Sequence, residues 1–185
     1  MRTQTYLFAI ILLLCAASCK KIKKLATINV NIPYNGVLGL PYVGDTAITL
    51  PPNGLSFSLP LYGMPTYSQQ FLSQYNTSAS KVNSAKLQNY SMQIVDPTGG
   101  YFYYLDTVQI YLSAHGQPEV LVAYNNNVPH DQNIVNMTST YIELKNYFLQ
   151  DSMFLRVYVN FIKVPKEADS ILMNTNFNLQ ADPLN

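Results

Sequence analysis

Apolar and polar residues alternate along most of this chain, as they do in a β-strand that buries one face. The two clearest runs lie near the end of the sequence. In the first run, the apolar side chains that share a face are Leu155, Val157, Val159 and Phe161. In the second run they are Ile171, Met173, Phe177 and Leu179. These runs predict two long strands, and Pro165–Asp169 between them predicts a hairpin.

Shorter alternating runs predict further strands in the first two thirds of the chain. They cover residues 27–32, 46–50, 55–61, 87–95, 108–113 and 119–124. Pro33–Gly36 is expected to end the first of them. Pro51–Gly54 and Asp96–Gly100 are expected to form hairpin turns, because proline, glycine and asparagine favour turns. Within residues 55–61, the side chains predicted to share one apolar face are those of Phe57, Leu59 and Leu61.

Two segments have the spacing of a short helix instead. Every fourth residue from Tyr67 to Tyr75 is aromatic, which predicts a helix near residues 67–75. Leucine and aromatic residues predict another near 142–150. Both are too short to connect parallel strands. Seven to nine strands with frequent turns therefore predict an antiparallel β-sandwich, immunoglobulin-like or jelly-roll-like, with one or two short helices.

The first residues have the layout of an export signal. Arg2 supplies a positive charge, and the apolar run Tyr6–Ala17 is too short to span the ~30 Å core of a bilayer. Small residues then precede Cys19, as in the lipobox of bacterial lipoproteins, in which this cysteine is acylated and becomes the first residue. The predicted parts are a signal peptide at 1–18, a lipidated basic tether at 19–24 and one domain at 25–185. The alternative is an uncleaved anchor or a buried N-terminal helix.

The number of cysteines and the distribution of charge limit the functions that this chain can have. Cys15 would leave with the signal and Cys19 would carry lipid, so the mature domain would have no thiol for a disulfide, a metal or a nucleophile. The four lysines of the tether favour anionic headgroups. Residues 25–185 carry six Lys or Arg against ten Asp or Glu, a net charge of −4 that does not suggest nucleic-acid binding. Only 11% of the residues are charged, so uncharged polar residues and tyrosine must form much of the surface.

Three features of the chain, taken together, are typical of one group of proteins. They are Ala16-Ala17-Ser18-Cys19, strands rich in Asn and Tyr, and a last strand that ends in residues 177–184. With these features the chain resembles the small β-sandwich lipoproteins of the Bacteroidota. The resemblance implies a cell-envelope protein and assigns no catalytic residue. In that group, lipoproteins exported to the surface tend to have acidic residues after the cysteine. The lysines of the tether therefore favour an outer-membrane anchor that faces the periplasm.

Catalytic and metal-binding patterns are weak. His115 and His130 lie in predicted turns, and no further ligand stands at the spacing of a zinc site. Oxygens of Asn125–Asn127 and Asp131 could hold Ca²⁺, but the alternation of a calcium loop is missing. The serine and glycine motifs of hydrolases and phosphate-binding loops do not occur, and the ten acidic residues are scattered. We therefore predict no enzyme, no metal and no cofactor.

The remaining candidate for a binding site is a cluster of aromatic residues. Tyr101, Tyr103 and Tyr104 follow a glycine turn, and successive residues of an extended chain point to opposite faces. At least one of these tyrosines should then be exposed, where it could stack on a sugar or contact a protein. The alternative is that Phe102 and Leu105 are core residues and the tyrosines pack at the sheet edge.

Together these patterns predict a lipid-anchored, non-catalytic module of the cell envelope that binds or assembles with an unidentified partner. It would contact the membrane through acylated Cys19, and its further partner would be an envelope protein or a glycan. Two alternatives remain. One is a glycan-binding lipoprotein that uses exposed tyrosines, and the other is an envelope hydrolase.

Cys19→Ala is expected to abolish lipid labelling and membrane retention, because the acyl chains would have no attachment site. Incorporation of a labelled fatty acid and fractionation of the cells measure these two properties. A variant that stays acylated and membrane-bound would contradict the assignment, and so would a wild-type mature N-terminus at a residue other than Cys19.

Overall fold

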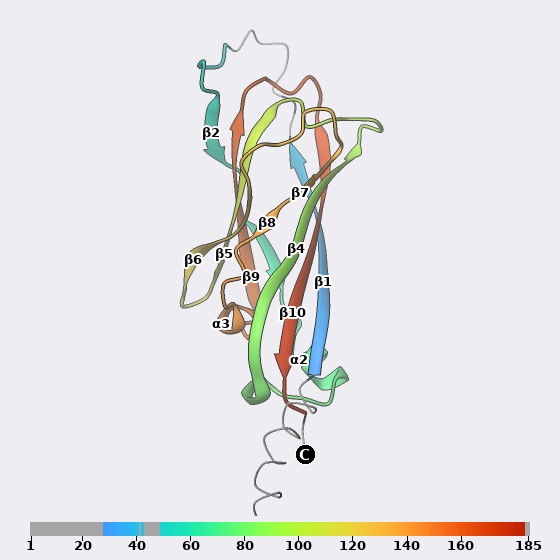
Figure 1. The fold of residues 1–185 in the computed structure, drawn as a ribbon, viewed down its shortest axis with the longest axis vertical. Helices are drawn as coiled ribbons and strands as arrows, with labels where there is room; N and C mark the ends of the chain where they lie inside the picture. The colour runs from blue at the N-terminus through green and yellow to red at the C-terminus, as the bar shows by residue number, and fades with distance from the viewer. Residues whose placement is uncertain (1–27, 41, 43–48, 184–185) are drawn as a thin grey trace, which may run out of the picture.

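The computed structural model describes residues 28–40, 42 and 49–183, whose strands form two antiparallel sheets packed face to face (Figure 1). The elements are β1 (Ile28–Leu40), β2 (Leu55–Ser58), β3 (Tyr62–Pro65), α2 (Ser68–Gln74), the 3-10 turn η1 (Ala79–Lys81), β4 (Val82–Asp96), β5 (Leu105–Ala114), β6 (Gln117–Asn125), β7 (Ile134–Asn136), β8 (Thr138–Ser139), α3 (Lys145–Phe148), β9 (Ser152–Phe161) and β10 (Asp169–Ala181). The predicted antiparallel β-sandwich is confirmed. The described residues form ten strands, where the sequence predicted seven to nine.

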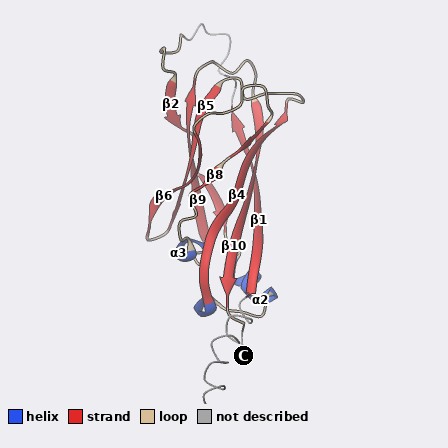
Figure 2. Ribbon diagram, viewed as in Figure 1, coloured by secondary structure: helices blue, strands red, loops and turns tan. Residues whose placement is uncertain are grey.

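The strands divide into a four-stranded and a six-stranded sheet. The four-stranded sheet has the order β1-β10-β4-β7, and the other has the order β2-β9-β5-β6-β8. β3 also pairs with β9, further along the edge that β2 occupies, so β2 and β3 act as two halves of one edge strand. Figure 2 shows the strands running along the molecule, with α2 and α3 in the lower part of the view. In that view, β1 starts at the lower end, where Ile28 pairs with Ala181, and finishes at the upper end, where Leu40 pairs with Asp169.

β1 is longer than the sequence predicted, because it continues through Pro33–Gly36 instead of ending there. Pro33 has no N–H to donate, and β1 is an edge strand that pairs with β10 on one side only. An edge strand tolerates proline because its outer row of N–H groups needs no partner in the sheet. The turn-like composition of this segment therefore marks a sheet edge.

Two of the three predicted hairpins are wrong, because their connections join strands of different sheets. Asp96–Gly100 leads from β4 in one sheet to β5 in the other, and Pro165–Asp169 leads from β9 to β10 in the same way. Pro51–Gly54 precedes β2, which pairs with β9, and the two described residues before this turn are not in a strand. The rest of that predicted strand, residues 46–48, lies outside the described residues. Reversals within a sheet and between sheets produce the same alternation, so the pattern could not separate them.

Both predicted helices are present in shorter form, as α2 and α3. In α2 the buried side chains are those of Ser68 and Leu72, whereas Tyr67 and Tyr75 are exposed and Phe71 is partly buried. The aromatic spacing therefore predicted the position of this helix correctly, but not its buried face.

The inward residues of the last two strands form much of the core, as predicted. The buried residues are Leu155, Val157, Val159, Ile171, Met173, Phe177 and Leu179. Thr175 lies in the same inward row, and its Oγ1 donates a 2.6 Å hydrogen bond to the carbonyl oxygen of Tyr34. Two positions differ from the prediction, since Phe161 is only partly buried and Leu61 is exposed. Leu61 lies between β2 and β3, where this edge of the sheet is interrupted.

Phe177→Ala is expected to lower the free energy of unfolding by about 3–5 kcal/mol, because it leaves a cavity in the core. Phe177 is only 1% exposed. Phe161→Ala is the matched comparison, and its loss should be smaller because Phe161 is already partly exposed. Urea denaturation of both variants measures the difference. An unchanged midpoint for Phe177→Ala would show that the inward row of β10 is assigned wrongly.

Candidate functional site

In the described part of the chain, one long side of the sandwich lacks backbone pairing between the two sheets. On this side, which we call the seam, β1 of the four-stranded sheet faces the β2–β3 edge of the other sheet. The opposite side is bridged, because residues 134–139 pass from β7, which pairs with β4, to β8, which pairs with β6. Side chains must therefore close the seam.

Tyr34 and Tyr62 close the lower half of the seam. The Tyr34 hydroxyl donates a hydrogen bond to the carbonyl oxygen of Thr66, and the Tyr34 ring meets Phe71 edge-on with centroids 6.1 Å apart. Burial raises the pKa of Tyr34, so its phenol stays protonated and able to donate. Tyr62 packs on β1 at Gly36, where a Cβ atom would lie 2.7 Å from the Tyr62 hydroxyl oxygen. Glycine at this position lets the two edges approach.

The upper half of the seam contains a cavity of about 420 Å³. The residues that line this seam cavity are Gly39, Leu40, Leu50, Leu55, Phe57, Ser58, Leu59, Pro60, Phe161, Lys163, Val164 and Pro165. They come from the end of β1, from the edge strand β2 with its flanks, and from the connection between β9 and β10. Nearly all are apolar, and Lys163 is the one charged residue among them. The cavity lies at the end of the sandwich opposite to the start of β1.

Two aromatic contacts hold one wall of the seam cavity in place. The rings of Phe57 and Phe161 meet edge-on with centroids 4.9 Å apart, and Phe161 meets Tyr104 in the same way at 5.4 Å. Edge-to-face pairs contribute stability beyond the area that they bury. Phe161 keeps some exposure because it borders the cavity, which explains its difference from the core position that the sequence predicted.

The structure separates the three candidate tyrosines. Tyr101 is 50% exposed, Tyr103 is partly buried and Tyr104 is only 1% exposed. All three lie in the connection between β4 and β5 and not in a strand, so their exposure does not follow strand alternation. Tyr101 has the exposure that a surface contact requires. Tyr104 belongs to the core together with Phe102 and Leu105, so the prediction that it contacts a ligand at the surface is wrong.

Tyr103 and Tyr104 each have a structural partner. The Tyr103 hydroxyl accepts a 2.7 Å hydrogen bond from the backbone N–H of Lys166, whose Nζ lies 5.9 Å from the centre of the Tyr103 ring. The Tyr104 hydroxyl donates to the carboxylate of Asp169 at the start of β10. Because Asp169 pairs with Leu40, this hydrogen bond fixes the ends of β1 and β10 beside the seam cavity.

Among the described residues, two carboxyl groups have a displaced pKa, and each has a structural explanation. Burial raises the pKa of Asp169, and the hydrogen bond from Tyr104 opposes that shift. Partial burial acts on Glu143 in the same direction, but two backbone N–H groups and the Ser84 hydroxyl bind this carboxylate and hold its pKa below the usual value. Both groups are therefore used within the fold.

The other candidates from the sequence lie apart from the seam cavity. His115 and His130 are exposed, and the described residues contain no group of three or more His, Cys, Asp or Glu that could hold a metal ion. The Asn125 side chain holds its own turn, since its Oδ1 accepts from the Asn127 N–H and its Nδ2 donates to the Asn136 carbonyl oxygen, both at 2.9 Å. Cys19 and the predicted signal and tether lie outside the described residues.

Two further depressions lie at the lower end of the molecule. Their volumes are about 340 and 390 Å³. The first follows the start of α2, and the second lies beside His115, Asp151 and Ser152. Both are more open than the seam cavity and have a larger polar share of lining, so they are weaker candidates for an enclosed binding site.

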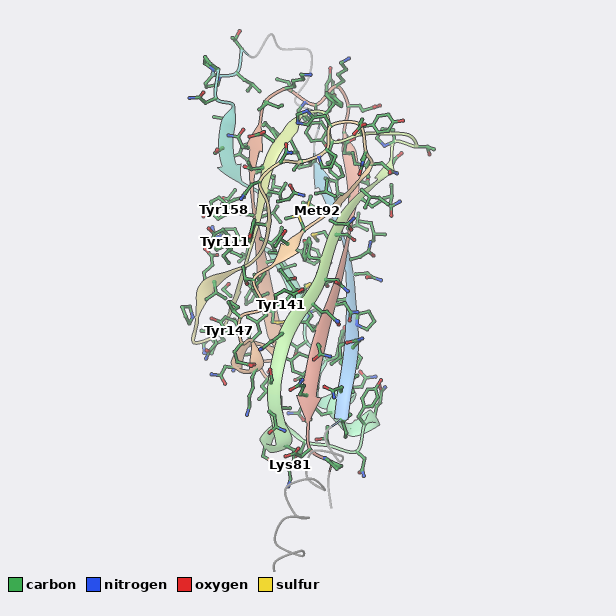
Figure 3. The ribbon with its side chains drawn as sticks, in the orientation of Figure 1. Lys81, Met92, Tyr111, Tyr141, Tyr147 and Tyr158 are labelled. Atoms are coloured by element: carbon green, nitrogen blue, oxygen red, sulfur yellow. The ribbon has the colours of Figure 1, made fainter. Side chains whose placement is uncertain are left out.

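A second group of tyrosines lies on the outer face of the six-stranded sheet. Figure 3 shows Tyr111 of β5 and Tyr158 of β9 near each other on this face, and their ring centroids are 5.2 Å apart. An ion pair between Arg156 Nε of β9 and Glu119 Oε1 of β6, 2.8 Å long, crosses the intervening strand β5 there. Sequence reasoning missed these tyrosines because residues 47 positions apart give no local cluster.

Sequence reasoning also missed the seam cavity, since its lining comes from segments that are distant in the sequence. One local signal was available. Leu50 and Leu55 flank the polar turn Pro51–Gly54, and both line the cavity. Apolar residues on both sides of a turn are common, so this signal alone does not indicate a site.

Comparison with known proteins assigns no family. No protein-family model and no curated protein matches the chain. Among solved structures, the chain is similar to the decameric BFDV capsid protein, with 6% identity over 84% of this chain and 98% of that one and a TM-score of 0.42. It is also similar to a turnip yellow mosaic virus chain, with 10% identity over 85% and 95% of the two chains and a TM-score of 0.30. Similarity at this level carries no functional argument.

Helices α2 and α3 are short, and within residues 28–40, 42 and 49–183 no helix has the length and apolar content that a membrane crossing requires.

Asp169→Asn is expected to make the stability of the domain less dependent on pH. Burial raises the pKa of this carboxyl in the folded state. It therefore stabilises the fold fully below its unfolded pKa of about 3.9, and that contribution is lost as the pH rises through the folded pKa. Asparagine does not ionise but still accepts a hydrogen bond from Tyr104. The stability of the variant relative to wild type should thus increase with pH from about pH 4 upward, as measured by denaturation.

The exposed Asp151→Asn variant is the control for the loss of one negative charge. Tyr104→Phe removes the donor and leaves the buried carboxylate unpaired, so it should destabilise the domain by about 1–3 kcal/mol. A relative stability of Asp169→Asn that stays constant with pH would contradict the burial of this carboxyl group.

Proposed function

We propose that this chain is a lipid-anchored, non-catalytic binding or assembly module of the bacterial cell envelope, with the seam cavity as its binding site. The cavity carries the proposal because it is concave, mostly apolar and about 420 Å³ in volume. Small-molecule sites in proteins have this character and span roughly 300–1,000 Å³. Apolar walls with one lysine suit a site that holds a molecule and does not transform it.

In this proposal, the length of the domain determines how the cavity is placed relative to the membrane. Eight residues separate Cys19 from Ile28, and they span at most about 30 Å when extended. β1 has thirteen residues and rises about 40 Å between its ends. Acylation of Cys19 would hold the lower end of the sandwich near the outer membrane, and the cavity would open at the far end, toward the periplasm.

The proposal of a non-catalytic module rests on how the polar groups near the cavity are used. The Asp169 carboxylate accepts the Tyr104 hydroxyl, and the Tyr103 hydroxyl accepts the Lys166 N–H. These groups support the wall of the cavity. A general acid or base would need to reach a bound molecule, and these groups bond to the protein instead.

The experiment compares the molecules that co-purify with the full chain from cell membranes. Leu55→Trp enlarges a side chain that lines the cavity and is 46% exposed, so it should block the cavity without disturbing the core. Leu61→Trp is the matched control, since Leu61 is 49% exposed on the same edge but does not line the cavity. Mass spectrometry of extracted molecules should find a compound on wild type and Leu61→Trp that is depleted on Leu55→Trp. Equal recovery on all three chains would overturn the proposal.

Glycan binding through exposed tyrosines is the second candidate function. The observation that favours it is the exposure of Tyr101, together with the paired rings of Tyr111 and Tyr158 on the outer face of the six-stranded sheet. Tyrosine rings can stack on sugars while their hydroxyls bond to water or to the ligand. A co-purified glycan that is lost in Tyr101→Ala, kept in Tyr101→Phe and unaffected by Leu55→Trp would favour this function over the cavity.

A further inference from the structure

We infer that the seam cavity binds the hydrocarbon chain of a fatty acid, whose carboxylate pairs with Lys163 at the mouth. This inference rests on the proposed function and names the ligand class of the same site. It follows from the size of the cavity, from the chemistry of its lining and from Lys163, the one cation among its described lining residues.

The lining selects an apolar ligand. Leucine, valine, proline and phenylalanine side chains form most of the surface. A polar ligand would lose its hydration there without gaining hydrogen bonds, which is unfavourable. A hydrocarbon chain instead binds more tightly there, with an affinity that rises roughly fourfold for each methylene that leaves water.

The volume selects one chain. About 420 Å³ lies near the lower limit of the range for small-molecule sites. The cavity is also bounded on one side by fixed aromatic contacts, those of Phe57 with Phe161 and of Phe161 with Tyr104. A single narrow chain fits this space, whereas a lipid with two chains would need the walls to separate.

The charge selects an anionic end group. Lys163 is exposed and lines the cavity. Within the described residues the one ion pair joins Arg156 to Glu119, so the Lys163 ammonium has no carboxylate partner there. Lys166 differs, because its ammonium lies over the Tyr103 ring. A free cation at the mouth of an apolar cavity complements the carboxylate of a fatty acid.

Photo-crosslinking tests the inference on the full chain in membranes of the cells that make it. The probe is a fatty acid with a diazirine at the end of its chain, and the comparison probe is the alcohol of the same length. After illumination, peptide mapping locates the label and mass spectrometry gives its yield, normalised to labelled membrane lipid. The expected label lies in residues 49–60 and 161–165.

The variants distinguish the contribution of the hydrocarbon chain to binding from that of the carboxylate head group. Leu55→Trp should lower the yield about tenfold or more, because it displaces several methylenes, and Leu61→Trp should not. Lys163→Gln should lower the yield of the acid roughly two- to fivefold, as for an exposed ion pair, and leave the alcohol unchanged. Lys166→Gln is the control for charge. Thermal unfolding checks that each variant folds, and Val164→Trp replaces Leu55→Trp if that variant does not.

Two results would overturn the inference. One is labelling of the 49–60 and 161–165 peptides that neither Leu55→Trp nor Val164→Trp reduces. The other is an acid probe that labels the wild-type cavity no better than the alcohol. These outcomes are distinct from failure of the proposed function. If a different compound co-purifies and is displaced by Leu55→Trp, the binding module stands and the fatty acid is excluded. Cavity labelling that persists in Cys19→Ala shows that the ligand site does not depend on the anchor.

Discussion

Tyr34 joins the two sheets along the side where their edge strands share no backbone pairing. Its hydroxyl donates to Thr66 just beyond β3, and its carbonyl oxygen accepts from Thr175 of β10. Its ring also packs edge-on against Phe177, with centroids 5.6 Å apart. The hydrogen bond to Thr66 offsets the cost of burying the Tyr34 hydroxyl, because an unpaired polar group in the core is unfavourable. One side chain therefore supplies both the packing and the polar link that hold the lower seam closed.

The seam cavity lies where this closure stops. Above Gly36, Gly39 and Leu40 of β1 border a space of about 420 Å³ that is lined mostly by apolar side chains. An apolar space of this kind forgoes the contacts that a filled core would make, which lowers stability. A ligand that fills it restores those contacts, and it stabilises the folded state in proportion to its affinity and concentration. The incomplete closure of the seam is thus what makes a binding site available.

The sequence predicted much of the fold and little of the site, for a physical reason. Alternation reports which face of a strand is buried, so the inward rows of β9 and β10 were correct up to Phe161. It does not report which sheet a strand joins, so Asp96–Gly100 and Pro165–Asp169 were interpreted as hairpins. The cavity depends on that missing information. Its lining meets only when β1 and β2 lie at facing edges of different sheets. Exposure in the 101–104 segment was also unpredictable, since this segment is a connection in which each ring follows its own contacts.

The residues that line the seam cavity differ in how firmly they are held. Phe161 of β9 is supported by Tyr104, whose hydroxyl is bonded to Asp169 at the start of the long strand β10. Beside it in the same sheet is β2, a strand of four residues at the sheet edge, none of which is fully buried. Short edge segments with little burial open at lower free energy than core strands do. A ligand in the cavity would meet a fixed aromatic surface at Phe161 and would gain its added contacts by ordering the edge strand β2. The specificity of the site should therefore come from Phe161, and access to it from β2.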